Sequence, residues 1–281
     1  MGAYCRKHGK GSLFQLVRQK MKIYIVTDNE GLAGVSSASY ISPAFERQDL
    51  IAHTRKLLAD EINACIEGGV RGGAAEIIVR DGHGDGQNVT RAMIDPRADL
   101  ICGATPGELL ADLDGSAGVI LLGYHAKAGT PGAVCEHTMS SLTWQNMWIN
   151  GRLTGEIGIC AYIAGEHGVP VIMVSGDDKC CAEAAEWLPE AVTCQVKKGF
   201  SCNGARIPAP EKTNALIAAK AEEAVRRSAE MPLLLAEKPV TMRLELVSRQ
   251  HLPVNPAYKH IDARTWELQH ESVEKAFFFN M

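Results

Sequence analysis

Three short apolar runs of the chain are each followed directly by acidic residues or histidines. These residues are Asp28 and Glu30 after the first run, Asp81 and His83 after the second, and His125 after the third. Carboxylates that crowd together repel one another unless a cation neutralises them. Carboxylate and imidazole ligands in one set suit a borderline metal ion such as Zn²⁺. If the three runs lie side by side, the sequence predicts a metal site to which all of them contribute.

Two more segments carry groups that suit the same site. The Gly- and Pro-rich segment 129–139 contains Glu136 and His137, and a histidine on such a loop is a candidate general acid or base. Glu156 stands at the start of a predicted helix, where its alternative role is a favourable interaction with the helix dipole. Each residue alone also has a structural explanation, because an acid after a strand often caps a helix. Their expected convergence is what favours the metal site.

The apolar runs are typical of buried strands. They are rich in Val, Ile and Leu and almost uninterrupted, which indicates strands covered on both faces of a parallel sheet. The predicted strands are Lys22–Thr27, Ala75–Arg80, Gly118–Leu122 and Val169–Val174. The carboxyl ends of parallel strands meet at one edge of a sheet, where open α/β folds form their sites. We therefore expect the acidic residues and histidines to meet at that edge.

Helical patterns lie between and after these strands. The predicted helices are Gln48–Ile66, Ile157–Gly165, Cys180–Leu188 and Thr213–Met231. The Gly-Gly pair at 68–69 is expected to end the first of them. The alternation of strands and helices indicates an α/β fold with a mostly parallel central sheet flanked by helices.

Two other patterns predict antiparallel strands. The pair Asn150-Gly151 suits a two-residue hairpin turn between the segments 144–149 and 152–154. The segment 240–247 alternates apolar and polar residues, which predicts a half-exposed strand with 263–268 as its partner. The expected parts of the chain are a disordered N-terminal extension (1–20), an α/β catalytic domain with the metal site (21–205) and a smaller C-terminal α+β segment (206–281).

The composition excludes several classes of protein. The 281 residues carry a net charge of −4 and are 46% hydrophobic, which excludes a collagen-like chain, a disordered tail and a basic nucleic-acid binder. No apolar run reaches the roughly 18 residues that span a membrane. Nine scattered cysteines without a CxxC pair indicate free thiols in a reducing cytoplasm. We therefore expect a cytoplasmic protein with neither nucleic-acid nor membrane partners.

Five segments resemble one known family in sequence and in order. They are VTDNEG at 26–31, DGHG at 81–84, GYHA at 123–126, GTPGAVCEHTM at 129–139 and NGRLTGEIG at 150–158. Together they resemble the DppA-like D-aminopeptidases, a family of di-zinc metallopeptidases. The resemblance implies a ring-like homo-oligomer, a decamer, that removes N-terminal D-amino acids from short peptides. The chain stops before the longer closing helix of the family, so we expect residues 277–279 to be partly uncovered or to pack against a neighbouring subunit.

The resemblance also implies a role for each candidate residue. The ligands of two Zn²⁺ ions per subunit would be Asp28 as the bridge, Glu30 and His83 at one ion, and His125 and Glu156 at the other. Mn²⁺ or Co²⁺ would suit the same ligands. His137 would be the catalytic histidine, which donates a proton to the leaving amine or stabilises the oxyanion. The acids expected to orient the ligating histidines are Asp81, Asp177 and Asp178.

The leading hypothesis is therefore a zinc-dependent aminopeptidase acting on short peptides that begin with D-Ala or another D-residue. Two-metal centres hydrolyse many kinds of bond, so a two-metal amidohydrolase or esterase with a non-peptide substrate is the alternative. A non-catalytic metal-binding assembly protein is a weaker alternative, because structural zinc sites are usually rich in thiolates.

Overall fold

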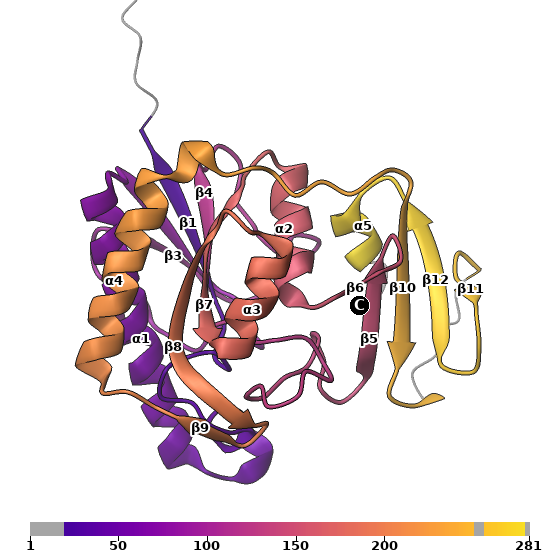
Figure 1. Cartoon of the computed structure of the whole chain (residues 1–281), viewed down its shortest axis with the longest axis horizontal. Coiled ribbons are helices and arrows are strands. Elements are labelled where there is room, and N and C mark those ends of the chain that lie inside the picture. Colours follow the sequence, from indigo (N-terminus) through magenta and orange to yellow (C-terminus); the bar gives the residue numbers. More distant parts are fainter. Residues whose placement is uncertain (1–19, 250–255, 279–281) are drawn as a thin grey trace, which may run out of the picture.

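The computed structural model describes residues 20–249 and 256–278, and Figure 1 shows a larger sheet with its helices beside a smaller sheet. The expected disorder of residues 1–20 concerns a segment that, apart from Lys20, lies outside the described residues. Within the described ranges, no helix is long and apolar enough to cross a membrane.

The larger sheet has seven strands in the order β3-β2-β1-β4-β7-β8-β9. They are β1 (Lys22–Thr27), β2 (Glu76–Asp81), β3 (Asp99–Ile101), β4 (Gly118–Leu122), β7 (Val171–Asp177), β8 (Val192–Ser201) and β9 (Gly204–Arg206). All neighbours are parallel except β8 and β9, which confirms the predicted mostly parallel sheet. β1 and β4 have the predicted bounds, whereas β3, β8 and β9 correspond to no predicted strand.

The register of β1 with its two neighbours sets the position of the site. Thr27, the last residue of β1, pairs with Asp81 of β2 and with Leu122 of β4. The three strands therefore end level with one another. The acidic residues and histidines that follow them all start from the same edge of the sheet, as predicted.

The smaller sheet is antiparallel, with the order β11-β12-β10-β5-β6. Its strands are β5 (Trp144–Ile149), β6 (Arg152–Thr154), β10 (Val240–Leu246), β11 (Lys259–His260) and β12 (Thr265–His270). The predicted hairpin is confirmed, and Asn150 and Gly151 at its turn have φ angles of 49° and 78°. The predicted pairing of β10 with β12 is also confirmed. This sheet takes strands from both sides of residue 205. The division into 21–205 and 206–281 stays a prediction.

Helices cover both faces of the larger sheet. The α-helices are α1 (Gln48–Gly72), α2 (Glu156–Glu166), α3 (Asp178–Trp187), α4 (Pro210–Arg226) and α5 (Val273–Phe278), and the 3-10 helices are η1 (Ala38–Tyr40), η2 (Pro43–Phe45), η3 (Arg91–Met93) and η4 (Ser228–Glu230). The predicted end of α1 at the Gly-Gly pair is wrong, since the helix continues to Gly72 and is capped by Gly73, which has a φ of 107°. A Cβ at Gly68 would lie 2.1 Å from the Ala218 carbonyl oxygen of α4, so this glycine lets the two helices touch.

The core forms two apolar layers. Ile25 of β1 and Ile62 of α1 belong to the layer beneath α1 and α4, while Tyr24 and the antiparallel sheet belong to the layer around α2. Phe277 is fully buried in this second layer and packs edge-on against Trp144, with ring centroids 6.0 Å apart. The expectation that residues 277–279 are partly uncovered or pack against a neighbouring subunit is therefore wrong for Phe277, which its own chain buries. Phe278 is half-buried, as expected, and Phe279 lies outside the described residues.

Candidate metal centre

The turn after β1 packs closely against the turn after β4. Gly31 N donates a hydrogen bond to the Gly123 carbonyl oxygen at 2.7 Å. A Cβ at residue 31 would lie 1.9 Å from the Tyr124 carbonyl oxygen, so only glycine permits this approach. The turn that carries Asp28 and Glu30 is thereby held against the segment that follows β4.

All six candidate residues lie together at this edge of the sheet. The distances are 3.4 Å from His83 Nε2 to Glu30 Oε1, 3.3 Å from His125 Nε2 to Asp28 Oδ2, 3.2 Å from His125 Nε2 to Glu156 Oε1 and 3.6 Å from His137 Nε2 to Glu156 Oε1. The rings of His125 and His137 stack with centroids 4.1 Å apart. His125 shares ligand atoms within 4.8 Å with two groups, Asp28 and Glu30 on one side and His137 and Glu156 on the other.

Several of these ligand atoms are buried without a hydrogen-bond partner among the described residues. They are Asp28 Oδ2, Glu30 Oε2 and His125 Nε2. A buried polar atom without a partner is costly, and a carboxylate charge without one is more so. Divalent cations between these atoms would satisfy them and would neutralise carboxylates that otherwise repel one another. The donor set therefore fits a metal.

The charges of the site shift one another strongly. Burial, reinforced by the Glu30 carboxylate, raises the pKa of Asp28 well above its usual 3.8. Burial opposes the charge of Glu30, but His83 holds the pKa of Glu30 well below its usual 4.5. Burial likewise opposes a proton on His125, and Glu156 nevertheless raises the pKa of His125 well above 6.5. Strong mutual shifts of this kind are common at functional sites.

Backbone carbonyls orient two of the histidines. His125 Nδ1 donates to the Ala126 oxygen at 3.0 Å, and His137 Nδ1 donates to the Cys135 oxygen at 2.9 Å. A carbonyl oxygen only accepts, so each Nδ1 carries a proton, which leaves Nε2 as the ring nitrogen that can offer a lone pair. Nε2 is the atom that faces the carboxylates, which suits it to bind a metal or to exchange a proton.

The expectation that Asp81, Asp177 and Asp178 accept hydrogen bonds from these histidines is wrong. Asp81 accepts from the backbone and side-chain nitrogens of Asn88 at 2.6 and 2.8 Å. Asn88 Oδ1 in turn lies 3.4 Å from His83 Nδ1, so Asp81 acts on His83 only through an amide. Asp177 caps α3. Asp178 accepts from Lys179 Nζ and from the backbone nitrogen of Gly199 in β8, both at 2.9 Å.

The loop 129–139 is tied to its surroundings on both sides of His137. Its contacts are Val134 N to Asp177 Oδ2 at 2.8 Å, Cys135 N to the Cys202 oxygen at 3.0 Å and Met139 N to Glu156 Oε1 at 2.7 Å. Cys135 and Met139 have φ angles of 50° and 58°, a strained conformation for non-glycine residues that is common near active sites. Glu136 instead accepts from Gly129 N within the loop and belongs to neither of the two ligand groups found among the described residues.

A cleft of about 640 Å³ opens onto the site. Its walls include Asp28, Glu30, His83, His137 and Glu156. His125 lies behind them and is 2% exposed. The size suits a small ligand with a few converging polar groups.

Lys197 of β8 holds the turn after β1 and was not expected at the site. Its buried ammonium donates to the carbonyl oxygens of Glu30, Leu32 and Val35, the last two at 2.8 and 2.7 Å. All three of its protons are thus used on the backbone that presents Glu30. The only sequence signal for this role is a lysine directly after the buried Val196 of β8.

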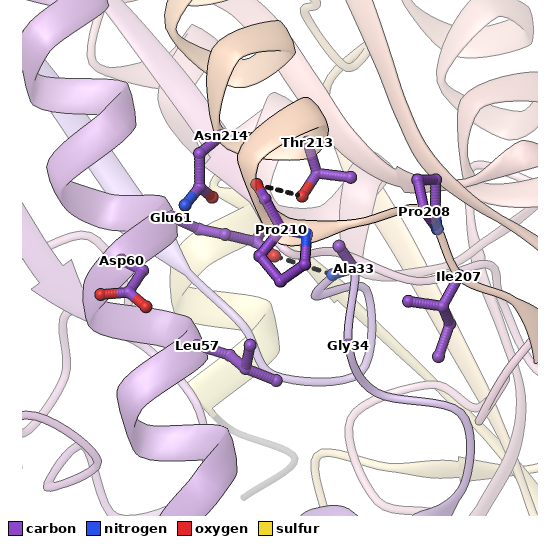
Figure 2. A pocket seen from close by; sticks show the side chains of 10 residues that line it. All are labelled: Ala33, Gly34, Leu57, Asp60, Glu61, Ile207, Pro208, Pro210, Thr213 and Asn214. Atoms are coloured by element: carbon purple, nitrogen blue, oxygen red, sulfur yellow. Dashed lines mark hydrogen bonds between the residues drawn. The ribbon is translucent and has the colours of Figure 1, made fainter.

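Glu61 of α1 holds the same turn from the other side. Figure 2 shows it reaching Ala33, whose backbone nitrogen donates to Glu61 Oε1 at 2.8 Å. The second oxygen, Oε2, has no hydrogen-bond partner among the described residues, and a cavity of about 20 Å³ lies beside it. Burial raises the pKa of Glu61 to about 7, although Ala33 N and Lys197 both lower it.

Replacing Lys197 with methionine is expected to destabilise the protein and to weaken metal retention. The change leaves three carbonyl oxygens without their donor, so the free energy of unfolding should fall by about 3 kcal/mol. Urea denaturation and metal content after dialysis measure the two effects. Lys198→Met is the matched control, because Lys198 is the exposed neighbour on the same strand. Equal stability of both variants would contradict the role of Lys197.

Replacing Glu61 with glutamine is expected to prevent the fall in the free energy of unfolding that wild type shows as the pH rises to neutrality. The pKa of Glu61 is raised from 4.5 to about 7 in the folded state, so the folded protein binds this proton more tightly than the unfolded chain. Wild-type stability is therefore lost as the pH rises through that window, by about 3 kcal/mol in total. In urea denaturation, the free energy of unfolding of Glu61→Gln relative to that of wild type should rise by about 3 kcal/mol between pH 4.5 and pH 8. Glu76→Gln, at an exposed position of β2, should show no such gain.

The α/β fold and the carboxylate and imidazole groups at its carboxyl edge define a metal-dependent hydrolase. Comparisons with known proteins agree with this class. A D-aminopeptidase of Bacillus subtilis (strain 168) is 34% identical over 223 residues, which cover 78% of this chain and 80% of that protein. The D-aminopeptidase family model matches residues 21–281, and the chain belongs to this family.

A solved structure has the same fold. It is the Zn-dependent D-aminopeptidase DppA from Bacillus subtilis, described as a self-compartmentalizing protease. The TM-score is 0.84 at 29% sequence identity, and the match covers 93% of this chain and 95% of that chain. The family resemblance expected from the five sequence segments is thus confirmed.

Proposed function

We propose that the protein is a zinc-dependent aminopeptidase that removes N-terminal D-amino acids from short peptides. The observation that carries the proposal is the set of buried ligand atoms of Asp28, Glu30 and His125 that lack a hydrogen-bond partner among the described residues, at or just behind the wall of the cleft. Membership of the D-aminopeptidase family supports the reaction. The zinc dependence of the B. subtilis structure supports the choice of metal.

The ligand groups suit two Zn²⁺ ions per subunit. Asp28 would bridge them, with Glu30 and His83 at one ion and His125 and Glu156 at the other, in keeping with the short distances within each pair. Mn²⁺ and Co²⁺ accept the same donors. When bound, two such ions activate a water molecule and polarise the scissile carbonyl.

His137 is proposed as the catalytic histidine. Its Nδ1 proton is held by the Cys135 carbonyl, so Nε2 is the atom free to take up and release a proton. That atom lies 3.6 Å from Glu156 Oε1 on the wall of the cleft. From there His137 donates a proton to the leaving amine nitrogen or stabilises the oxyanion.

Metal analysis combined with a substrate panel tests the proposal. We expect about two zinc ions per chain, and hydrolysis of D-Ala-D-Ala and D-Ala p-nitroanilide in preference to their L-counterparts. A chelator should abolish the activity and added Zn²⁺ should restore it. Preferential hydrolysis of simple esters would instead indicate the two-metal esterase alternative. Bound metal without hydrolysis of any substrate would indicate a structural metal site.

We also propose a ring-like homo-oligomer, a decamer, in the cytoplasm. The description of the B. subtilis structure as a self-compartmentalizing protease supports assembly. Leu142, which lines the cleft, and Phe200 are 84% and 63% exposed and are candidates for burial at a subunit contact. Light scattering should give about ten times the chain mass of 30.3 kDa. A monomeric mass would contradict the assembly but not the chemistry.

A further inference from the structure

Arg80 places a positive charge in the wall of the cleft. It is the residue before the last of β2, and it is 9% exposed. Its Nη1 donates to the Gly103 oxygen at 2.7 Å and its Nη2 to Thr105 Oγ1 at 3.2 Å, both neutral acceptors. Its Nε has no hydrogen-bond partner among the described residues.

No carboxylate within residues 20–249 and 256–278 forms an ion pair with Arg80, in contrast to more exposed arginines. Arg97 and Arg243, for example, have carboxylate oxygens at 2.8 and 2.7 Å. Glu108 lines the same cleft but is exposed and forms no ion pair with Arg80. A nearly buried guanidinium without an anion is costly, so this arrangement points to an anionic ligand.

The same cleft connects Arg80 with the candidate metal ligands, including Asp28, Glu30 and His137. A ligand that fills it would therefore meet both the metal centre and a guanidinium. A short peptide has a scissile carbonyl near one end and a carboxylate at the other. Guanidinium and carboxylate match in charge and in paired hydrogen-bond geometry.

We propose that Arg80 binds the free C-terminal carboxylate of the peptide while its N-terminal bond lies at the metal centre. This inference rests on the proposed aminopeptidase function. Arg80 is then a specificity-determining residue, which favours short peptides with a free carboxylate over capped peptides and over longer chains whose carboxylate lies out of reach. Gly103 and Thr105 position the guanidinium by accepting hydrogen bonds from its Nη1 and Nη2.

Paired substrates test this role. D-Ala-D-Ala and its C-terminal amide differ only in the group that Arg80 would bind. We expect wild type to prefer the free acid, and the ratio of kcat/KM for acid over amide to fall on the order of 10- to 100-fold in Arg80→Gln, mainly through KM. Arg80→Lys, which keeps the charge but not the paired donors, should give an intermediate ratio.

Arg91→Gln is the matched control. Among the described residues, Arg91 also bonds to neutral carbonyl oxygens, those of Ile94 and Asp95, but it is exposed and does not line the cleft. Its ratio should equal that of wild type. An unchanged ratio in Arg80→Gln would overturn the proposal. If Arg80→Gln does not fold, wild type alone decides, because equal kcat/KM for acid and amide excludes a carboxylate site.

A failure of the proposed function would look different. In that case metal-loaded wild type hydrolyses neither the acid nor the amide, and the assignment of Arg80 falls with it. Hydrolysis of both substrates at equal rates by wild type leaves the aminopeptidase function intact and removes only the role of Arg80.

Discussion

Replacing Glu30 with alanine is expected to abolish peptidase activity and to lower the amount of bound zinc. Glu30 is 4% exposed, and its Oε1 lies 3.4 Å from His83 Nε2. Its Oε2 has no hydrogen-bond partner among the described residues, which leaves this oxygen available to a metal ion. A bound metal lowers the barrier by several kcal/mol, so kcat/KM for D-Ala-D-Ala should fall at least about 1,000-fold.

Three measurements separate a lost ligand from a general structural defect. Zinc per chain after dialysis should fall, and added zinc should raise the melting temperature of Glu30→Ala less than that of wild type. His83→Ala should give the same effects, because His83 is assigned to the same ion. Glu76→Ala, at the exposed opposite end of β2, should change neither zinc content nor activity. Full activity in Glu30→Ala or His83→Ala would falsify the ligand assignment.

The parts of the fold that sequence predicts well are those fixed by local chemistry. β1 and β4 are predicted to the residue, because an uninterrupted apolar run that ends at an acid or a glycine fits only the interior of a sheet. The hairpin of β5 and β6 is predicted because Asn150 and Gly151 tolerate the positive φ angles of its turn.

Tertiary contacts decide the parts that were not predicted. The apolar pattern of β8 is broken by Lys197 and Lys198, and Lys197 is buried only because a distant turn supplies three carbonyl acceptors. α1 continues through Gly68 because α4 packs against it at that point. Neither partner is visible in the local sequence.

The candidate site divides in the same way. Four of its residues, Asp28, Glu30, His83 and His125, could be gathered from the sequence because they follow parallel strands that end at a common edge. The roles of His137 and Glu156 came from the family resemblance. The groups that orient the histidines could not be predicted, since two of them are backbone carbonyls, which carry no signal in the residue type. The burial of Arg80 could not be predicted either, because a charged residue near the end of a strand is normally exposed.

His137→Ala is expected to remove most of the activity while leaving the bound zinc in place. A general acid or base contributes about 100- to 10,000-fold, so kcat for D-Ala-D-Ala should fall within that range. The expectation follows from the position of His137 on a loop at the cleft wall, with Nε2 3.6 Å from Glu156 Oε1 and the ring stacked on His125. His53→Ala, at an exposed position of α1, should leave kcat unchanged.

The zinc content of His137→Ala decides between two roles that the geometry allows. His137, His125 and Glu156 offer ligand atoms within 4.8 Å of one another, so His137 Nε2 is also near enough to serve as a ligand. A metal ligand and a proton donor use the same lone pair of Nε2 and cannot share it at one moment. Two retained zinc ions with lowered kcat would therefore assign His137 to proton transfer. Loss of one zinc ion would instead move it into the ligand set and leave the proton transfer to another group.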